Sequence, residues 1–500
     1  MERPVDRVPV ASSAPRTSLS QKPSDVRVVG VELYFLPVPA RTPLKFGSET
    51  LTSVTCARVR AIVADRQGRT MDGWGETPLS VQWTWPCNLP YRVRDAALQH
   101  FCRQLAVAWA EFEAYGHALE VGEAFVRTRL GQVRERFNRR LPPSERMPAL
   151  ASLVCCSAFD VAVHDAFARL LQLPVYDTYG PEHMNCDLSH FLESADDEVF
   201  DFRGLYPESF LQRPAATTLP VWHLVGGLDP LSPEELTPES PVDAHPVLLT
   251  DWIRRDGLKC LKIKLRGDDE AWDYDRVIRV GRLAGELGVE QLTTDFNCMV
   301  REPSYVMRIL DRLRVEHPAI HAMILYVEQP FPYDMEACPI DVRDLVSRKP
   351  LLMDESADDW RHVRLGRSLG WNGVALKTCK TQTGALLSLC WAKAHGMHVM
   401  VQDLTNPMLA QIPHVQLAAH AATMRGVESN AMQFYPDASA PEAEIHPGLY
   451  RRREGRLDLS SLRGPGFGYR VEEIARTLPA PVLVHTAASK GSSAVVPETL

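Results

Sequence analysis

Short apolar runs alternate with helical patterns through the second half of this chain. In the helical patterns apolar residues recur every three or four positions, as they do on one face of a helix. Eight apolar runs are predicted to be strands, at residues 221–225, 260–265, 291–295, 324–328, 351–354, 374–377, 398–402 and 426–428. Strands that alternate with helices form a parallel sheet, and eight such units predict a (β/α)8-type barrel. The predicted fold class is therefore α/β.

The first half of the chain has a different pattern. Apolar and polar residues alternate near residues 26–38 and 54–65, which is typical of antiparallel strands, and Gly68 and Gly73 are predicted to make the turns. Residues 91–150 are predicted to be mainly helical, and the apolar spacing over 151–171 predicts one long helix. This part is therefore predicted to be a separate α+β unit.

Composition limits the classes of partner. Lysine and arginine number 55 against 63 aspartates and glutamates, so the net charge of −8 gives no electrostatic reason to bind nucleic acid or an acidic membrane. The 11 cysteines are scattered and contain no CxxC pair, which argues against a disulfide framework or a zinc site and favours the reducing cytoplasm. No apolar run is predicted to reach membrane-spanning length, and the start of the chain has no signal-peptide pattern. Small molecules are the expected partners.

Charged residues stand at the ends of five successive predicted strands. They are Lys262 and Lys264, then Asp295, then Glu328, then Asp354, then Lys377. Because the carboxyl ends of barrel strands meet at one mouth, these side chains are expected to share a site. Three carboxylates make an oxygen-rich site that suits one Mg²⁺ ion, whereas softer metals prefer Cys or His.

Lysines on both sides of such a site suit the movement of a proton at a carbon next to a carboxylate. That carbon is a very weak acid, and its anion survives as an enediolate only if a cation holds the charge. A lysine acts as a base only when it is neutral, and a positive neighbour disfavours its charged form. Lys262 is therefore expected to lower the pKa of Lys264, with Lys377 acting from the opposite side.

The ordered set of motifs resembles the enolase superfamily, in particular its muconate-lactonising-enzyme-like and mandelate racemase family members. The resemblance rests on LKIKLRG, TTDFN, YVEQP, MDES and VALKTCKTQTGA, supported by FDVAVHDAFARLLQLPVYDTYG and GPGFGY, and it covers residues 26–479. Members of this superfamily use a Lys or His base with one or two Mg²⁺ ions. The resemblance implies metal ligands at Asp295, Glu328 and Asp354, and catalytic lysines at Lys264, Lys377 and, as an electrostatic helper, Lys262.

The resemblance also implies the division of the chain. An α+β capping domain at 26–176 precedes an enolase-like barrel at 220–445, and a return segment at 446–484 packs on the cap. Residues 177–219 are an insertion or connector, while 1–25 and 485–500 are predicted to be flexible tails. The chain is longer than family members usually are, with extra material in 91–150 and 181–219. The resemblance also points to a homo-oligomer.

Six further residues are predicted to contact the substrate. Two lie on the cap and four on the rim of the barrel: Phe46, Trp85, Asn297, Gln402, Asp403 and Glu428. Packing, caps and turn hydrogen bonds explain these residues about as well.

The leading hypothesis is a Mg²⁺-dependent racemase or epimerase of a small carboxylate, because lysines on opposite faces are what inversion at one carbon needs. Cycloisomerisation and dehydration by β-elimination share the same intermediate and stay open. Two further alternatives are a Schiff-base lyase that uses Lys264 or Lys377, and a non-catalytic barrel that serves as a binding or scaffold protein.

Overall fold

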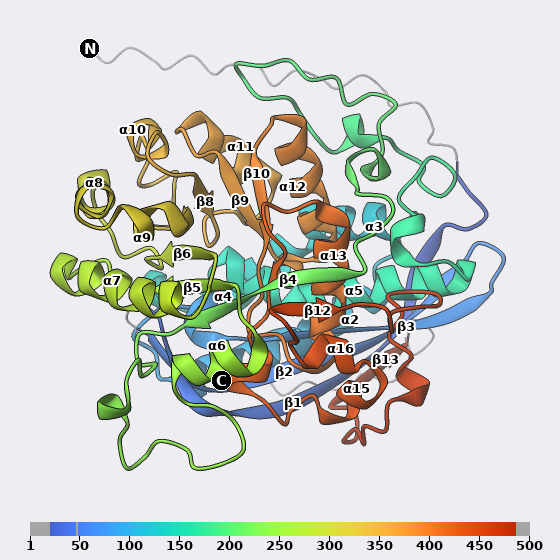
Figure 1. Ribbon diagram of the computed structural model, residues 1–500. Coiled ribbons are helices and arrows are strands. Elements are labelled where there is room, and N and C mark those ends of the chain that lie inside the picture. Colours follow the sequence, from blue (N-terminus) through green and yellow to red (C-terminus); the bar gives the residue numbers. More distant parts are fainter. Residues whose placement is uncertain (1–20, 47–48, 487–500) are drawn as a thin grey trace.

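The computed structural model of the protein describes residues 21–46 and 49–486. It consists of an antiparallel sheet with its own helices and a parallel barrel surrounded by helices (Figure 1). The α/β barrel with a capping unit, predicted from the sequence, is confirmed. The tails predicted at 1–25 and 485–500 lie almost wholly outside the described residues.

The sheet of the capping unit joins the two ends of the chain. Its strand order is β13-β1-β2-β3. Strands β1 (Val26–Phe46), β2 (Glu49–Asp65) and β3 (Thr70–Pro78) follow one another, whereas β13 (Leu483–Thr486) comes from the far end of the chain. A turn at Gly68, with φ of 81°, joins β2 to β3. Residues 30–33 of β1 pair with β13, so the first and last described strands are neighbours.

Five helices belong to the capping unit: α1 (Val81–Thr84), α2 (Tyr91–Ala110), α3 (Ala118–Phe125), α4 (Gly131–Asn138) and α5 (Ala149–Leu171). Helix α5 lies against β2 and β3. A Cβ atom at Gly73 would lie 2.1 Å from the backbone nitrogen of Ala166, and one at Gly75 would lie 2.1 Å from the carbonyl oxygen of Ala158. The prediction of a turn at Gly73 is therefore wrong, because this glycine lies inside β3 and lets the helix approach.

The stretch Pro143–Leu171 is long and apolar enough to cross a membrane by length and composition. In the folded protein 89% of its most apolar window is buried, and α5 packs against the capping sheet. It is therefore a core helix, and the prediction that no apolar run reaches membrane-spanning length is wrong for this segment.

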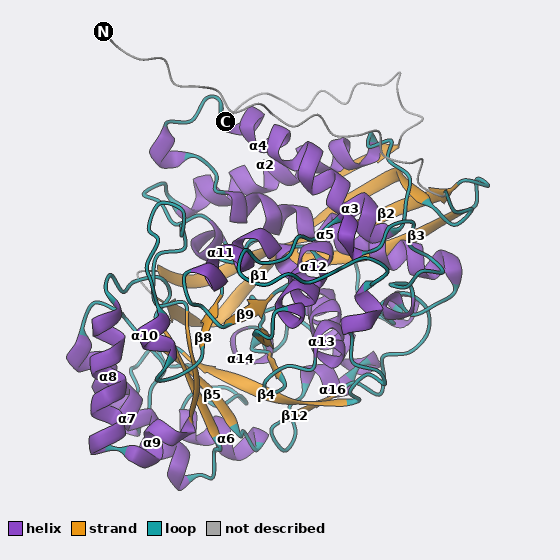
Figure 2. Ribbon diagram, turned by 90° about the horizontal axis from the view of Figure 1, so that it is seen from above, coloured by secondary structure: helices purple, strands orange, loops and turns teal. Residues whose placement is uncertain are grey.

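Eight parallel strands follow in chain order and form a closed barrel, because the last strand pairs with the first (Figure 2). They are β4 (Thr218–Val225), β5 (Cys260–Lys264), β6 (Gln291–Asp295), β7 (Ile324–Glu328), β8 (Leu351–Met353), β9 (Gly373–Leu376), β10 (His398–Val401) and β11 (Val427–Glu428). All eight coincide with strands predicted from the apolar runs.

Helices occupy the connections between barrel strands. They are α6 (Leu249–Asp256), α7 (Glu270–Glu286), α8 (Pro303–Glu316), α9 (Pro318–Met323), α10 (Arg343–Val346), α11 (Trp360–Ser368), α12 (Gln382–Ala394) and α13 (Gln411–Ala421), followed by α14 (Ala431–Phe434), α15 (Ala440–Ile445) and α16 (Pro447–Tyr450). In α7, Val277 and Val280 are fully inaccessible to solvent, and Leu283 and, just beyond the helix, Leu287 are partly buried.

The segment before the barrel, predicted to be an insertion or connector, has only short turns of 3-10 helix between residues 177 and 217. It nevertheless packs firmly, because Met184, Leu188 and Phe202 are buried in the main core. Arg364 and Arg367 of α11 form ion pairs with acidic residues at positions 193–198. The segment is thereby fixed to the outside of the barrel.

The chain after α16 returns across both units. Strand β12 (Arg456–Asp458) pairs antiparallel with β4 at the edge of the barrel. Further on, the backbone N–H of Phe467 donates to Asp165 of α5 over 2.9 Å. The structure therefore places part of the predicted return segment 446–484 against the capping unit.

Candidate active site

Adjacent barrel strands bring the predicted residues to one rim. The parallel register aligns Lys264 of β5 with Asp295 of β6, and Asp295 with Glu328 of β7. Asp354 directly follows β8, and Lys377 directly follows β9. All five therefore lie at carboxyl ends of strands, where the active sites of such barrels are found.

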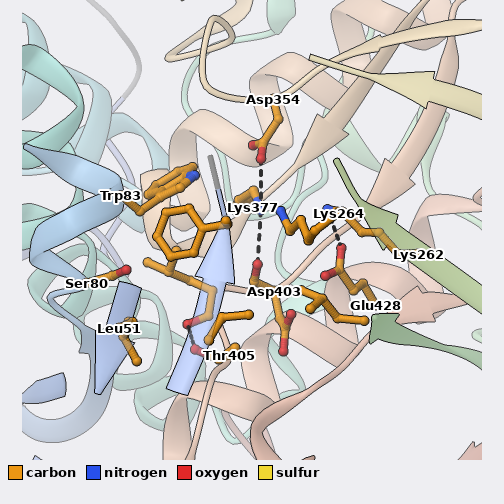
Figure 3. A pocket seen from close by; sticks show the side chains of 14 residues that line it. Leu51, Ser80, Trp83, Lys262, Lys264, Asp354, Lys377, Asp403, Thr405 and Glu428 are labelled. Atoms are coloured by element: carbon orange, nitrogen blue, oxygen red, sulfur yellow. Dashed lines mark hydrogen bonds and ion pairs between the residues drawn. The ribbon is translucent and has the colours of Figure 1, made fainter. Parts of the chain in front are cut away.

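A cavity of about 430 Å³, part of it open to solvent, lies between this rim and the capping unit (Figure 3). The barrel contributes charged groups to its wall, and the cap contributes mostly apolar ones. The charged residues are Lys262, Lys264, Asp354, Lys377, Asp403 and Glu428, and the cap residues are Leu44, Phe46, Leu51, Ser80 and Trp83. The cavity is thus suited to a small molecule with a charged end.

Two lysines of β5 are tied to carboxylates. The Lys264 amino group donates to Asp295 over 2.5 Å. The Lys262 amino group contacts Glu328 at 2.6 Å, Glu428 at 3.0 Å and Asp295 at 3.1 Å. Lys262 is therefore a bridge among acids from three strands.

Lys377 enters the same cavity from β9, and Figure 3 shows it between Asp354 and Asp403. Its amino group lies 3.2 Å from Asp354 Oδ2 and donates to the carbonyl oxygen of Asp403 over 3.0 Å. In the closed barrel β5 and β9 are four strands apart, which places them on opposite sides. Lys264 and Lys377 therefore face one cavity from opposite directions.

A further buried lysine, Lys380, was missed by the sequence reasoning. Its amino group donates to the carbonyl oxygens of Asp354 and Ala357 and lies 3.4 Å from Asp354 Oδ1. The motif KTCK contained the only signal, a second lysine three residues after Lys377. Lys380 holds the backbone of the β8 loop in place.

The pKa values at the rim follow burial and charge together. Burial opposes the charged form of Lys262, but Glu328, Glu428 and Asp295 outweigh it and raise its pKa well above the usual range. The pKa of Lys377 is also raised, since Asp354 outweighs the cost of burial. Burial raises the pKa of Glu328, and the charges of Asp295 and Asp354 raise it further.

The carboxylates and lysines at the rim determine whether a cation can bind there. Asp295, Glu328 and Asp354 supply oxygen donors only, all buried, which is the donor type that Mg²⁺ prefers. The surrounding cluster holds six buried carboxyl groups and four buried lysines, so acids exceed bases by two. Among the described residues no three acidic, His or Cys side chains form a ready-made metal site, and Lys262 lies between the carboxylates instead. By donor chemistry and charge the cluster fits one divalent cation.

Of the residues predicted on the cap, Phe46 lines the cavity and Trp85 does not. Trp85 is buried in the core of the capping unit, whereas Trp83 takes the place in the wall. The Lys377 amino group lies 5.2 Å from the centre of the Trp83 ring, and that of Lys264 lies 5.9 Å from the centre of Phe46. The one-turn helix α1 decides which tryptophan faces the cavity, and no periodicity in the sequence indicates it.

The four residues predicted on the barrel rim lie in different places. Asp403 and Glu428 line the cavity, and Asp403 also accepts a hydrogen bond from the backbone N–H of Asn430. Gln402 is fully buried below them, where it donates to Glu328 and to the Tyr326 hydroxyl. Asn297 lines a neighbouring chamber and donates to Glu355 over 3.3 Å.

Backbone in the left-handed region gathers around this rim. Six residues other than glycine have positive φ at strand ends or at the edge of the cap: Ser80, Asn297, Cys298, Gln329, Thr381 and Thr405. Such conformations cost on the order of 1–3 kcal/mol each and tend to cluster at functional sites. The concentration of strain here supports the same rim as the functional centre.

Comparison with known families agrees with this geometry. Residues 247–475 match the family model described as enolase C-terminal domain-like. The matched range includes all six charged residues predicted at the rim, from Lys262 to Lys377. The chain matches no curated protein by sequence.

Several solved structures share the fold of the whole chain. An N-succinyl Arg/Lys racemase from Bacillus cereus is 15% identical with a TM-score of 0.57, covering 92% of this chain and 99% of its own. A dipeptide epimerase from Enterococcus faecalis, complexed with Mg and a dipeptide, is 16% identical with a TM-score of 0.56, covering 88% and 99%. A muconate lactonizing enzyme from Pseudomonas fluorescens is 14% identical with a TM-score of 0.54, covering 90% and 98%.

Proposed function

We propose that the chain is an enzyme of the enolase superfamily, in the branch of mandelate racemase and the muconate lactonising enzymes, and that it moves the proton on the carbon next to a carboxylate group of a small, amino-acid-like acid. The proposed outcome is racemisation or epimerisation at that carbon. One observation carries this proposal: Lys264 and Lys377 line the same cavity from opposite sides of the barrel.

The two lysines would divide the proton transfer between them. The neutral amine of one takes the proton from the α carbon, and the electron pair of the C–H bond stays on the substrate. The ammonium group of the other then gives a proton to the opposite face of that carbon. The result is inversion with no net gain or loss of atoms, which a lysine on one side alone would not achieve.

The remaining groups would bind and orient the acid. Asp295, Glu328 and Asp354 would hold a Mg²⁺ ion, which when bound would attract the charge that develops on the substrate carboxylate. Lys262 adds positive charge on the same side of the cavity. The apolar cap residues Leu44, Phe46 and Trp83 exclude water from the α carbon, since they cover the cavity opposite the rim.

Exchange of the α-hydrogen for deuterium tests the proposal. N-acyl amino acids, dipeptides, hydroxyproline-type acids and sugar acids would be incubated with protein and Mg²⁺ in D₂O and followed by ¹H NMR. Lys264→Ala is expected to abolish exchange of one stereoisomer, and Lys377→Ala exchange of the other. Lys259→Ala is the matched control, because Lys259 precedes β5 and donates to Gly288, away from the cavity.

The products separate related reactions that begin with the same step. Inversion of an exchanged acid supports racemisation or epimerisation, whereas ring closure or loss of water would replace it with cycloisomerisation or elimination. If neither lysine variant alters exchange in any acid that the wild-type protein exchanges, the assignment of the bases is wrong.

A further inference from the structure

A second chamber adjoins the cavity that holds the lysines. It has a volume of about 660 Å³, part of it open to solvent, and lies between the cap and the loops that follow β6, β7 and β8. Phe46 and Trp83 line both spaces, so their rings form the boundary between them. Two neighbouring residues contribute to different spaces at this boundary: Asp354 lines the first cavity, and Glu355 lines the second.

The two spaces differ in charge. Three lysines and three carboxylates line the first cavity. The described lining of the second chamber contains Glu49 and Glu355 but no lysine, arginine or histidine. Its other walls include the apolar side chains of Leu150, Met299 and Pro148. A molecule that spans both spaces would therefore meet lysines as well as carboxylates at one end and carboxylates alone at the other.

Three of the residues that line the second chamber each have a buried oxygen atom that accepts no hydrogen bond within the described part of the chain. These atoms are Gln82 Oε1, Asn297 Oδ1 and Glu355 Oε2. Gln82 and Glu355 are more than nine-tenths buried. A buried acceptor without a donor costs about 1–3 kcal/mol, so such groups are rarely left unmatched without a reason.

Each of the two amide nitrogens makes one hydrogen bond away from these unmatched oxygens. The Gln82 amide nitrogen donates to the carbonyl oxygen of Thr50 over 3.2 Å. Trp83 Nε1 donates to Glu355 Oε1 over 3.0 Å, and the Asn297 amide nitrogen donates to the same oxygen. The Cys298 thiol also lies against Glu355, but a thiol is a weak donor. These contacts fix the orientation of the three side chains and leave one acceptor oxygen of each unmatched.

We infer that the second chamber binds a primary ammonium group at the far end of the substrate, so that the substrate is an acid whose side chain ends in an amine. This inference rests on the proposed function and names its substrate class. An ammonium group has three donors, which equals the number of unmatched acceptors. The Trp83 ring at the boundary adds a surface that attracts cations.

The length of the side chain follows from the shared boundary. Neighbouring Cα atoms are about 3.8 Å apart, so the step from Asp354 to Glu355 is short. Since Phe46 and Trp83 line both spaces, the inferred side chain is a run of methylene groups that passes these two rings on the way from the lysines to Glu355. The apolar residues of the chamber suit those methylene groups.

Three acids of similar length test the inference. N-acetyl-L-lysine ends in an ammonium group, N-acetyl-L-norleucine in a methyl group, and N-acetyl-L-2-aminoadipate in a carboxylate. Binding to the Lys264→Ala protein in the presence of Mg²⁺ would be measured by calorimetry, since this variant does not need to turn the ligand over. The lysine derivative is expected to bind at least about tenfold more tightly than the norleucine derivative, and the aminoadipate derivative most weakly.

Substitutions in the second chamber test whether its residues cause the preference for the lysine derivative. Glu355→Gln and Gln82→Leu, each combined with Lys264→Ala, are expected to lower the preference for lysine over norleucine by about tenfold. Glu286→Gln, at an exposed position in α7, is the matched control and should leave the preference unchanged. A far-ultraviolet circular dichroism spectrum verifies that each variant is folded.

The possible outcomes separate this inference from the proposed function. Equal binding of the lysine and norleucine derivatives, or a preference that survives both chamber variants, overturns the ammonium site even if α-exchange occurs. A preference for lysine that Glu355→Gln removes supports the site even if no acid exchanges its α-hydrogen, which would overturn the proposed reaction alone.

Discussion

Replacing Thr383 with valine is expected to weaken the contact between the capping unit and the barrel. Thr383 lies in the first turn of α12, and its hydroxyl is held between two residues of α5. It donates to Asp160 Oδ1 over 2.7 Å and lies 2.9 Å from His164 Nε2. The Tyr179 hydroxyl lies 2.9 Å from His164 Nδ1, so a chain of hydrogen bonds runs from Tyr179 through His164 and Thr383 to Asp160.

The size of the effect follows from what the valine would leave unpaired. It keeps the shape of threonine but removes the acceptor for His164 and one of the donors to Asp160. Each buried group left without a partner costs about 1–3 kcal/mol, and hydrogen bonds to charged groups lie at the upper end. The backbone N–H of Thr383 still donates to Asp160 over 2.9 Å, so part of the support remains. The expected loss of unfolding free energy at neutral pH is about 3–5 kcal/mol.

The pH dependence provides a second signature. Burial raises the pKa of Asp160 to about 6, and burial lowers the pKa of His164 to about 3, so His164 stays neutral while Asp160 titrates. Because the folded pKa of Asp160 is raised above its unfolded value, its ionisation reduces stability as pH rises from about 4 through 6. Loss of the Thr383 hydroxyl raises that pKa further, so the variant should be more destabilised at pH 7.5 than at pH 5.

Urea unfolding followed by circular dichroism and tryptophan fluorescence measures both effects. Thr128→Val, at an exposed position, is the matched control and should change little. The reasoning is refuted if Thr383→Val costs less than about 1 kcal/mol at pH 7.5, or if its cost is the same at both pH values.

Two further predictions concern the cation and the interface with the return segment. Asp295→Asn is expected to weaken Mg²⁺ binding by at least tenfold in calorimetry, compared with wild type and with the exposed control Asp251→Asn; equal affinity in all three would exclude Asp295 as a ligand. Burial raises the pKa of Asp165 to about 7, so its ionisation reduces stability by as much as about 4 kcal/mol as pH rises from about 4 to 7. Asp165→Asn should therefore flatten the fall in stability over that range, and an unchanged slope in urea titrations would contradict the assigned pKa.

The fold could be predicted from the sequence because its local patterns agree with its global arrangement. Each barrel strand is a short apolar run, and each is followed by a helix with one apolar face. The charged rim was also visible, since the residues stand at strand ends and the parallel fold brings such ends together. The family model that matches residues 247–475 agrees with the family resemblance named from these motifs, while the roles of Lys264, Lys377 and the three acids stay predictions.

Long-range contacts could not be predicted in the same way. Glu428 pairs with Lys262 across 166 positions of sequence, and Thr383 meets Asp160 across 223. Neither pairing leaves a local pattern, because each depends on how two units dock. Trp83 lies within the one-turn helix α1 and Trp85 is the residue that ends it, so no longer pattern shows which of them faces the cavity. Gly73 was predicted to make a turn because its contact with α5 leaves no local pattern in the sequence.

The pairing of β13 with β1 delays completion of the capping sheet while the protein is being synthesised. A ribosome releases the amino end first, so residues 30–33 wait for residues 483–486 while about 450 more are added. At about 5–20 residues per second this takes on the order of tens of seconds. During synthesis the nascent chain therefore carries an open strand edge that invites pairing with other chains, and a molecule cut short before its last strand would keep that edge permanently.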